Sequence, residues 1–290
     1  MRLRTRTTAA LVGALALSAV ASPVFAAEGQ PEKVSTTTVA HRGASAYAPE
    51  NTLAAFQVGI DQKATWIESD VQLTKDGEPV LIHDTTLTRT TDVEQVFPDR
   101  APWKVADFTL AEIKQLDAGS WFGEEFAGEP VPTLGEMVEQ VRKSRSGIIM
   151  ELKSPELYPG VEQKVADVFG SFPGYTESAL ANGRLAVQSF NWESMATYDA
   201  ISPATPLGLL GTVPADQLDE YARWADQVNP NFRTVTPEYV DAVHDAGLTI
   251  NPYTVNQVAD MNTLLDAGVD GIITDRPDVL ESVLHERNQG

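Results

Sequence analysis

The feature that most constrains the fold of this 290-residue chain is a regular alternation of short apolar segments with longer amphipathic ones. The apolar segments read as strands buried on both faces, and the amphipathic segments have apolar residues at helical spacing. The predicted strands are residues 38–40, 66–73, 147–152, 184–189, 206–210, 227–229, 248–253 and 271–274. The predicted helices that follow them are residues 52–61, 134–143, 161–169, 192–201, 215–224, 237–246, 257–267 and 279–286.

Eight strand–helix pairs in alternation predict an α/β protein, and this number is typical of a closed (β/α)8 barrel, the TIM barrel. An open, doubly wound sheet would show the same alternation. That fold carries a glycine-rich phosphate-binding turn, which this sequence lacks. The barrel is therefore the preferred prediction.

One segment interrupts the alternation after the second predicted strand. An extra strand at 79–84 is followed by residues 85–132, which are far longer than an ordinary connection. Aromatic residues recur along this segment, and they argue against disorder: Trp103, Phe108, Trp121, Phe122 and Phe126. We therefore expect a small, compact insertion over the mouth of the barrel, either as a structural cover or as part of the functional site.

The first residues resemble an export signal. Arg2, Arg4 and Arg6 precede an apolar run at 9–20, and Ala26 provides a small residue for cleavage. The run is too short to span a membrane, which takes about 20 apolar residues. We expect Sec-type export without a membrane anchor. The expected organisation is a signal peptide at 1–26, a flexible leader at 27–36 and one domain at 37–290.

Composition narrows the classes of partner. The chain has no cysteine, which excludes disulfides, thiolate metal sites and a lipidated cysteine anchor. Its formal net charge of −20 argues against nucleic acid or an anionic membrane surface as the main partner. We expect a small-molecule partner instead, and an anionic substrate would need a local positive site. The oligomeric state is left open.

Three carboxylates form a candidate metal site. Glu68 and Asp70 alternate along one predicted strand, so their side chains point to the same face. Glu151 lies near the end of the next barrel strand, and the carboxyl ends of barrel strands are where TIM-barrel chemistry is located. Oxygen ligands without cysteine indicate Ca²⁺ or Mg²⁺. A solvated acidic strand face is the alternative for the Glu68–Asp70 pair alone.

Two histidines and two cations lie near the same predicted strand ends. His41 follows the first strand and His83 ends the extra strand, and a histidine pair suits one general base and one general acid. Arg42 and Lys153 are the positive charges that a phosphate would need. Ordinary burial or surface ion pairing explains any one of these residues, but not their joint position.

Other polar and aromatic positions have smaller expected roles. The residues expected to line the pocket are Gln188, Phe190 and Tyr253. Glu50 is expected either as a charge partner of Arg42 or as a surface residue. Asn51 or Thr52 is expected to cap the following helix rather than to bind a ligand.

Six motifs together resemble the glycerophosphodiester phosphodiesterase family, in its exported bacterial form. The resemblance covers about residues 37–286. The motifs are His41-Arg42-Gly43, Pro49-Glu50-Asn51-Thr52, Glu68-Ser69-Asp70-Val71, His83-Asp84, Glu151-Leu152-Lys153 and Thr274-Asp275-x-Pro277. The segment after His83 is similar to the small insertion of this family. Tyr253 is a departure, because many members have Trp there.

The resemblance implies metal-dependent hydrolysis of glycerophosphodiesters, such as glycerophosphocholine or glycerophosphoethanolamine, to sn-glycerol 3-phosphate and an alcohol. It implies one divalent cation at Glu68, Asp70 and Glu151. It also implies acid/base work at His41 and His83, and phosphate contacts from two cations, which are Arg42 and Lys153.

Three alternatives stay open from the sequence. A lysophospholipase D or sphingomyelinase D-like enzyme resembles this family but needs a groove for an acyl chain. A phosphatidylinositol-cleaving phospholipase C also uses two histidines on a barrel, although its common bacterial forms lack the carboxylate metal site. A non-catalytic protein that binds phosphodiesters is the third.

Overall fold

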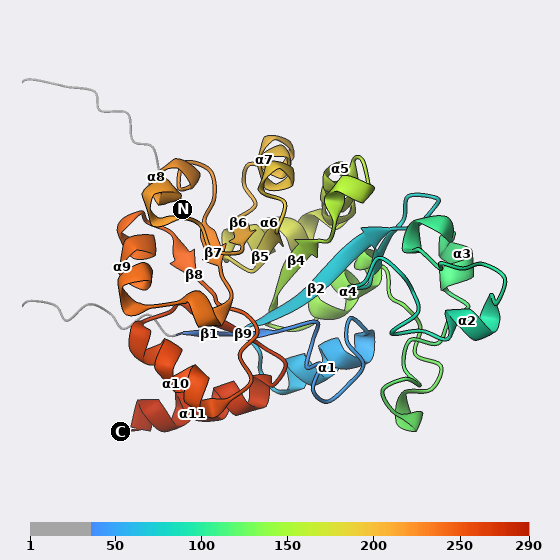
Figure 1. Ribbon diagram of the computed structural model, residues 1–290, viewed down its shortest axis with the longest axis horizontal. Helices are drawn as coiled ribbons and strands as arrows, with labels where there is room; N and C mark the ends of the chain where they lie inside the picture. The colour runs from blue at the N-terminus through green and yellow to red at the C-terminus, as the bar shows by residue number, and fades with distance from the viewer. Residues whose placement is uncertain (1–35, 290) are drawn as a thin grey trace, which may run out of the picture. The chain divides into compact units, whose positions relative to one another are not determined.

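The computed structural model describes residues 36–289, and the predicted signal peptide and nearly all of the predicted leader lie outside this range. The described strands form one sheet whose eight parallel members are rolled into a barrel, with helices on the outside (Figure 1). Within residues 36–289, no helix combines the length and the apolar character that crossing a membrane requires.

The parallel strands are β1 (Thr37–Ala40), β2 (Trp66–Leu73), β4 (Gly147–Leu152), β5 (Leu185–Ser189), β6 (Leu207–Leu210), β7 (Gln227–Asn229), β8 (Thr249–Ile250) and β9 (Gly271–Thr274). They are ordered β8-β7-β6-β5-β4-β2-β1-β9. Backbone hydrogen bonds from Asp270 to Ile250 (3.0 Å) and from Ile273 to Pro252 (3.0 Å) join the two ends. The predicted (β/α)8 barrel is thereby confirmed.

The eighth barrel strand is much shorter than predicted. The sequence favoured a strand over residues 248–253, but the structure has only Thr249–Ile250. Pro252 has no N–H to donate to a ladder, and beyond it only an isolated parallel bridge joins Tyr253 to Asn231, the second residue after β7. Regular strand pairing therefore ends at Ile250, although the carbonyl of Pro252 still accepts a hydrogen bond from the amide of Ile273 on β9.

The helices around the barrel are α1 (Leu53–Asp61), α4 (Leu134–Val141), α5 (Val161–Gly170), α6 (Pro173–Ala181), α7 (Trp192–Ile201), α8 (Leu218–Tyr221), α9 (Pro237–Asp245), α10 (Val258–Ala267) and α11 (Pro277–Gln289). The sequence did not predict α6, because only Ala179 of this helix is buried and no apolar stripe exists. The predicted helix 215–224 is also wrong in extent, since α8 is a single turn preceded by a 3₁₀ turn.

The segment after β2 forms a small unit at one side of the barrel (Figure 1). The short strand β3 (Pro79–Leu81) pairs antiparallel with β2, and two single-turn helices follow, α2 (Val93–Val96) and α3 (Leu110–Ile113). Ten buried apolar residues form a core apart from that of the barrel: Val80, Ile82, Leu87, Val93, Val105, Phe108, Ile113, Leu116, Ala118 and Val131. The amide of Leu81 donates to the carbonyl of Pro132 (2.8 Å), so the two ends of the segment lie side by side.

Candidate active site

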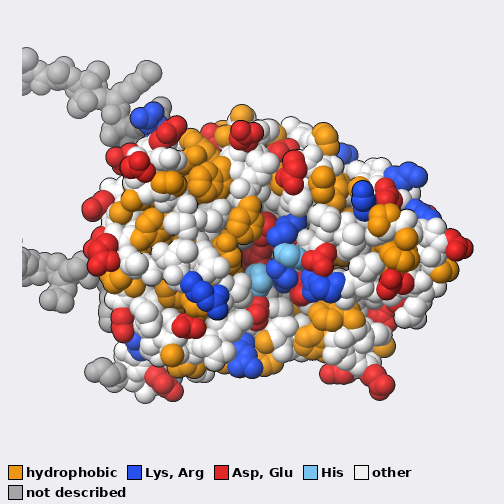
Figure 2. Space-filling model, viewed as in Figure 1, with side chains coloured by type: hydrophobic (Ala, Val, Ile, Leu, Met, Phe, Trp, Pro, Cys, Tyr) orange, Lys and Arg blue, Asp and Glu red, His pale blue; other side chains and the backbone are white. Residues whose placement is uncertain are grey.

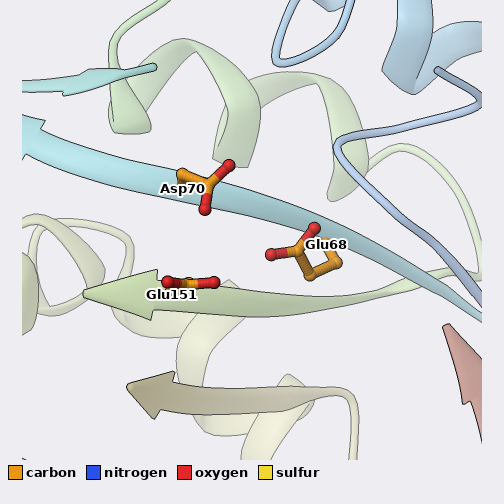
Figure 3. Close-up of side chains that lie close together, drawn as sticks. All are labelled: Glu68, Asp70 and Glu151. Carbon is orange, nitrogen blue, oxygen red and sulfur yellow. The ribbon is translucent and has the colours of Figure 1, made fainter. Parts of the chain in front are cut away.

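The three predicted metal ligands converge inside the barrel (Figure 3). β2 and β4 are parallel neighbours, and their register places Asp70 beside Glu151. Glu68 lies two residues before Asp70, so the strand periodicity directs both side chains to the same face. One oxygen from each of the three buried carboxylates lies within 4.8 Å of the others.

The electrostatics of this cluster fit a bound cation. Burial and the neighbouring carboxylates raise the pKa of Glu68, and burial with Asp70 raises the pKa of Glu151 to about 8. Burial would also raise the pKa of Asp70, but Arg42 and Lys153 outweigh it and hold that pKa at about 2. Oδ1 of Asp70 is buried and accepts no hydrogen bond. These buried, mutually repelling oxygens are a donor set that suits a hard divalent cation.

A tight turn after β1 directs the guanidinium of Arg42 into the cluster. Arg42 has a left-handed backbone (φ 55°) and its amide donates to Oε2 of Glu68 (2.8 Å). A Cβ on the next residue, Gly43 (φ 79°), would lie 2.5 Å from the carbonyl carbon of Ala55. The turn therefore requires glycine at this position. Nε of Arg42 lies 3.1 Å from Oδ2 of Asp70.

The predicted link between Arg42 and Glu50 is present, with Nη1 donating to Oε1 at 2.9 Å. Lys153, the other predicted cation, donates from Nζ to Oε1 of Glu151 at 2.9 Å. Neighbouring carboxylates outweigh the effect of burial and raise the pKa of both cations, so Arg42 and Lys153 are charged at neutral pH.

His41 is held by the barrel rim itself. Its Nδ1 lies 2.6 Å from Oδ1 of Asp275, which follows β9. Because a carboxylate only accepts hydrogen bonds, Nδ1 carries the proton and Nε2 is left for the pocket. Asp275 is fixed in turn by the hydroxyl of Ser45 (2.9 Å) and the amide of Asn256 (2.6 Å).

His83 has a similar carboxylate partner but a different setting. Its Nδ1 lies 2.7 Å from Oδ1 of Asp84. The side-chain amide of Gln72 on β2 donates to the carbonyl oxygens of residues 82–84, at 2.8, 3.0 and 2.7 Å. The hydroxyl of Tyr158 donates to Oε1 of Gln72 (2.7 Å). Burial is the main cause that lowers the pKa of His83.

These groups line one cavity of about 270 Å³. Figure 2 shows histidine and cationic side chains together around a hollow on the face turned to the viewer. In the same view the insertion with α2 and α3 lies at one side of the barrel (Figure 1), so it flanks the mouth and is not the cover that the sequence suggested. The predicted site residues that line the cavity are His41, Arg42, Glu68, His83, Glu151, Lys153, Gln188, Phe190 and Tyr253. Asp70 and Glu50 lie behind this lining, where each contacts Arg42.

An aromatic wall closes one side of the cavity. The rings of Phe190 and Tyr253 meet edge to face with centroids 5.8 Å apart, and Phe190 is 52% exposed. Nζ of Lys153 lies 5.5 Å from the centroid of the Phe190 ring. Gln188 lies deeper, where it accepts a hydrogen bond from Asn229 (2.7 Å) and approaches Glu68 (3.5 Å).

Sequence reasoning did not identify several residues that fix the site. Asn51 was expected only as a helix cap, but its amide donates to Oδ2 of Asp70 (3.0 Å), and Thr52 caps α1. The partner carboxylate Asp275 was recognised only as part of the motif after the last predicted strand, and no role was assigned to it. Strand alternation places Gln72 on the same face as Glu68 and Asp70, but its partners in residues 82–84 depend on how the insertion folds, as do those of Arg89.

The match to the glycerophosphoryl diester phosphodiesterase family model extends over residues 41–279. A glycerophosphodiester phosphodiesterase of Bacillus subtilis (strain 168) is 36% identical over 92% of this chain and 93% of its own length. A glycerophosphodiester phosphodiesterase from Caldanaerobacter subterraneus subsp. tengcongensis is 39% identical over 87% of this chain and 98% of its own length. The structure of an Oleispira antarctica phosphodiesterase in complex with its product sn-glycerol-3-phosphate superimposes with a TM-score of 0.75 at 28% identity, covering 86% of this chain and 96% of the other. The chain belongs to the glycerophosphoryl diester phosphodiesterase family.

Proposed function

We propose that the protein hydrolyses glycerophosphodiesters, such as glycerophosphocholine or glycerophosphoethanolamine, to sn-glycerol 3-phosphate and the free alcohol. The observation that carries this proposal is one cavity lined by two histidines, two cations and carboxylates of an oxygen-only cluster. The Bacillus and Caldanaerobacter relatives named for this activity, and the product bound to the Oleispira enzyme, support it.

Arg42 and Lys153 bind the phosphodiester anion in this proposal. Both side chains line the cavity and are charged at neutral pH. Fixed cations stabilise charge that develops on phosphoryl oxygens, which is usually the largest contribution to such reactions. The aromatic wall of Phe190 and Tyr253 contacts the carbon skeleton of the substrate.

The two histidines divide the proton transfers. His41 accepts at Nε2 the proton of the nucleophile, which is water or the 2-hydroxyl of the glycerol group. The nucleophile's oxygen bonds to phosphorus, and the bond from phosphorus to the alcohol oxygen breaks. His83 enters this step as the imidazolium, with Nδ1–H donating to Asp84, and it protonates the leaving oxygen from Nε2. If the 2-hydroxyl attacks, water then opens the resulting cyclic phosphate with the proton roles reversed.

Glu68, Asp70 and Glu151 would hold one divalent cation, which we propose is Ca²⁺ or Mg²⁺ because all the donors are carboxylate oxygens. When bound, this ion supplies Lewis-acid polarisation of a phosphoryl oxygen. Arg42 also keeps Asp70 ionised, so the cluster has a permanent anionic ligand before the ion binds.

The decisive experiment is release of glycerol 3-phosphate from glycerophosphocholine by protein treated with EDTA, with Ca²⁺ or Mg²⁺ then restored in parallel. Activity that disappears on chelation and returns with one ion supports the reaction and the metal together. Activity indifferent to chelation would contradict the metal assignment. Tight binding of the diester without turnover would support a binding protein instead.

The size of the cavity favours small diesters over lipids. A volume of about 270 Å³ lies just below the usual range for small-molecule pockets and leaves little room for an acyl chain. Lysophosphatidylcholine in the same assay should therefore be a much poorer substrate than glycerophosphocholine. The reverse preference would support the lysophospholipase D-like alternative.

We also propose that residues 1–26 direct Sec-type export and are removed after Ala26, on the basis of their basic and apolar pattern. N-terminal sequencing of protein recovered from the extracytoplasmic fraction tests this. A sequence that begins at Ala27 supports the proposal, and retention of the full chain in the cytoplasm contradicts it.

A further inference from the structure

We propose that Arg89 is a positioning residue that holds His83 and Arg42 in a fixed relation through the carboxylates of Asp84 and Glu50. The inference rests on the proposed function, in which His83 transfers a proton and Arg42 binds the phosphoryl group. Neither the motifs nor the cavity lining includes Arg89, whose contacts are with Asp84 and Glu50.

The guanidinium of Arg89 contacts two carboxylates from different parts of the fold. Its Nε donates to Oδ2 of Asp84 at 2.6 Å, and its Nη2 lies 3.2 Å from Oδ1 of the same group. Its Nη1 and Nη2 donate to the two oxygens of Glu50 at 2.8 and 2.7 Å. Asp84 belongs to the insertion, whereas Glu50 lies in the loop before α1, so Arg89 connects the insertion to the barrel.

Each of these carboxylates contacts a residue of the proposed reaction on its other side. Asp84 accepts from Nδ1 of His83 at 2.7 Å, and Glu50 accepts from Nη1 of Arg42 at 2.9 Å. An unbroken series of charged contacts therefore runs from the proton-transferring group to the phosphate-binding group. Arg89 is the central member of this series.

The chemistry of this position requires arginine. An exposed ion pair between single charges contributes little to stability, so stability alone is a weak reason for such a network. A guanidinium presents several donors in one rigid plane and can serve two carboxylates at once, whereas an ammonium acts as a point charge. Both carboxylates are ionised for this purpose. Hydrogen bonds from Arg89 lower the pKa of Asp84, and for Glu50 burial is outweighed by Arg89 and Arg42, which lower its pKa.

The test is chemical rescue of Arg89→Ala. We expect kcat for glycerophosphocholine to fall about 10- to 100-fold, because small displacements of reacting groups cost up to about 100-fold. The Arg89 side chain is 43% exposed, so added guanidinium can enter the space left by the truncation. Guanidinium should restore a large part of kcat, whereas ammonium should not. Arg89→Lys should also have a low kcat. Lysine keeps the positive charge but lacks the planar set of donors that serves two carboxylates at once.

Arg100→Ala is the matched control. Arg100 is another insertion arginine of similar exposure, and it pairs with Glu112 (2.7 Å) and lies over the ring of Phe108 (4.1 Å), away from the cavity. The kcat of Arg100→Ala should stay within about twofold of that of the wild type and should not respond to guanidinium. A structural effect common to insertion arginines would impair both variants equally.

Hydrogen exchange of the metal-free proteins gives a readout independent of catalysis. We expect faster exchange in residues 83–89 and 42–51 for Arg89→Ala than for Arg100→Ala. Normal kcat in Arg89→Ala, a loss that guanidinium does not reverse, or unchanged exchange would each overturn the inference. If the wild type releases no glycerol 3-phosphate, the proposed function fails, and the exchange comparison alone decides whether Arg89 positions these loops.

Discussion

The two histidines of the cavity are held by different kinds of structure. His41 directly follows a barrel strand, and its partner Asp275 follows the adjacent strand and accepts hydrogen bonds from neutral groups on the barrel rim. His83 follows the short antiparallel strand β3, and its partner Asp84 is held by Arg89, a cation from the insertion itself. The geometry around the two imidazole rings is alike, but the supports are not.

This difference separates two ways of building a site. The barrel fixes His41 through parallel strand ends, which any (β/α)8 chain brings together. The insertion has to fix His83 with its own small core, one strand pair and the amide of Gln72. We therefore expect the insertion half of the cavity to be the more easily disturbed by substitution.

The largest expected effect tests whether both halves are needed for turnover. His41→Ala and His83→Ala should each lower kcat by about 10²–10⁴-fold, as removal of a general acid or base does. His244→Ala is the control, because His244 pairs with Asp270 outside the cavity and should leave kcat unchanged. Steady-state release of glycerol 3-phosphate measures all three. Normal turnover in either cavity variant would remove that histidine from the mechanism.

The next effect compares the two cores. Phe108 in the insertion and Phe56 in the barrel are both fully buried, so truncation of either to Ala should cost about 3–5 kcal/mol. We expect Phe108→Ala to open the insertion alone, and Phe56→Ala to lower the stability of the whole barrel. Urea unfolding combined with hydrogen exchange distinguishes these outcomes. Equal acceleration of exchange in both regions after Phe108→Ala would mean that the two cores unfold as one unit.

A smaller effect tests the hold of β2 on the insertion. Gln72→Leu removes the donor to three carbonyl groups of residues 82–84, and leaving such buried groups unpaired costs about 1–3 kcal/mol. We expect lower stability together with a kcat reduced about 10-fold, because the backbone of His83 loses its support. Tyr158→Phe is the control, since it removes a bond to Gln72 but leaves the amide in place. Similar kcat losses in both variants would contradict this assignment.

The smallest expected effect concerns how much the ionised Asp84 contributes to the stability of the folded protein at low pH. Hydrogen bonding to Arg89 is the main cause that lowers its folded pKa to about 2, against about 3.9 for an unfolded Asp. The folded state thus binds fewer protons, so the contribution of this group is present above about pH 4 and is lost as the pH falls toward 2. The stability difference between wild type and Asp84→Asn should therefore shrink over that range in urea titrations. A difference that is constant with pH would contradict the lowered pKa.

The barrel half was predictable from sequence because its rules are local and repetitive. Alternation along one strand and the shared edge of parallel strand ends were enough to predict that Glu68, Asp70 and Glu151 meet near one point. In the insertion half, His83 and a compact segment were predicted, but the contacts that hold them were not, because residues 82–132 have no single periodicity. The contact between Arg89 and Glu50 joins residues 39 positions apart through a loop conformation that no residue pattern encodes.

The same reasoning explains where the predicted helices and strands differ from those of the structure. Alternation predicted the order of strands, but not that Pro252 would end β8 after two residues. Helix α6 escaped prediction because only Ala179 is fully buried, with Tyr175 and Leu180 partly buried against the core, so its sequence has no apolar stripe to detect. Burial pattern therefore predicts the elements that build the core and misses those that only lie against it.

The paired ends of the insertion have an evolutionary consequence. The hydrogen bond between Leu81 and Pro132 closes the segment at its base, so its length can change without a change in the distance that the barrel must bridge. Recombination between related chains at these two points would exchange one wall of the cavity as a unit and leave the strand order intact. A functional graft would need only to keep a histidine against its carboxylate and an arginine that reaches Glu50. The fold thus separates a constant frame from a replaceable part at a defined boundary.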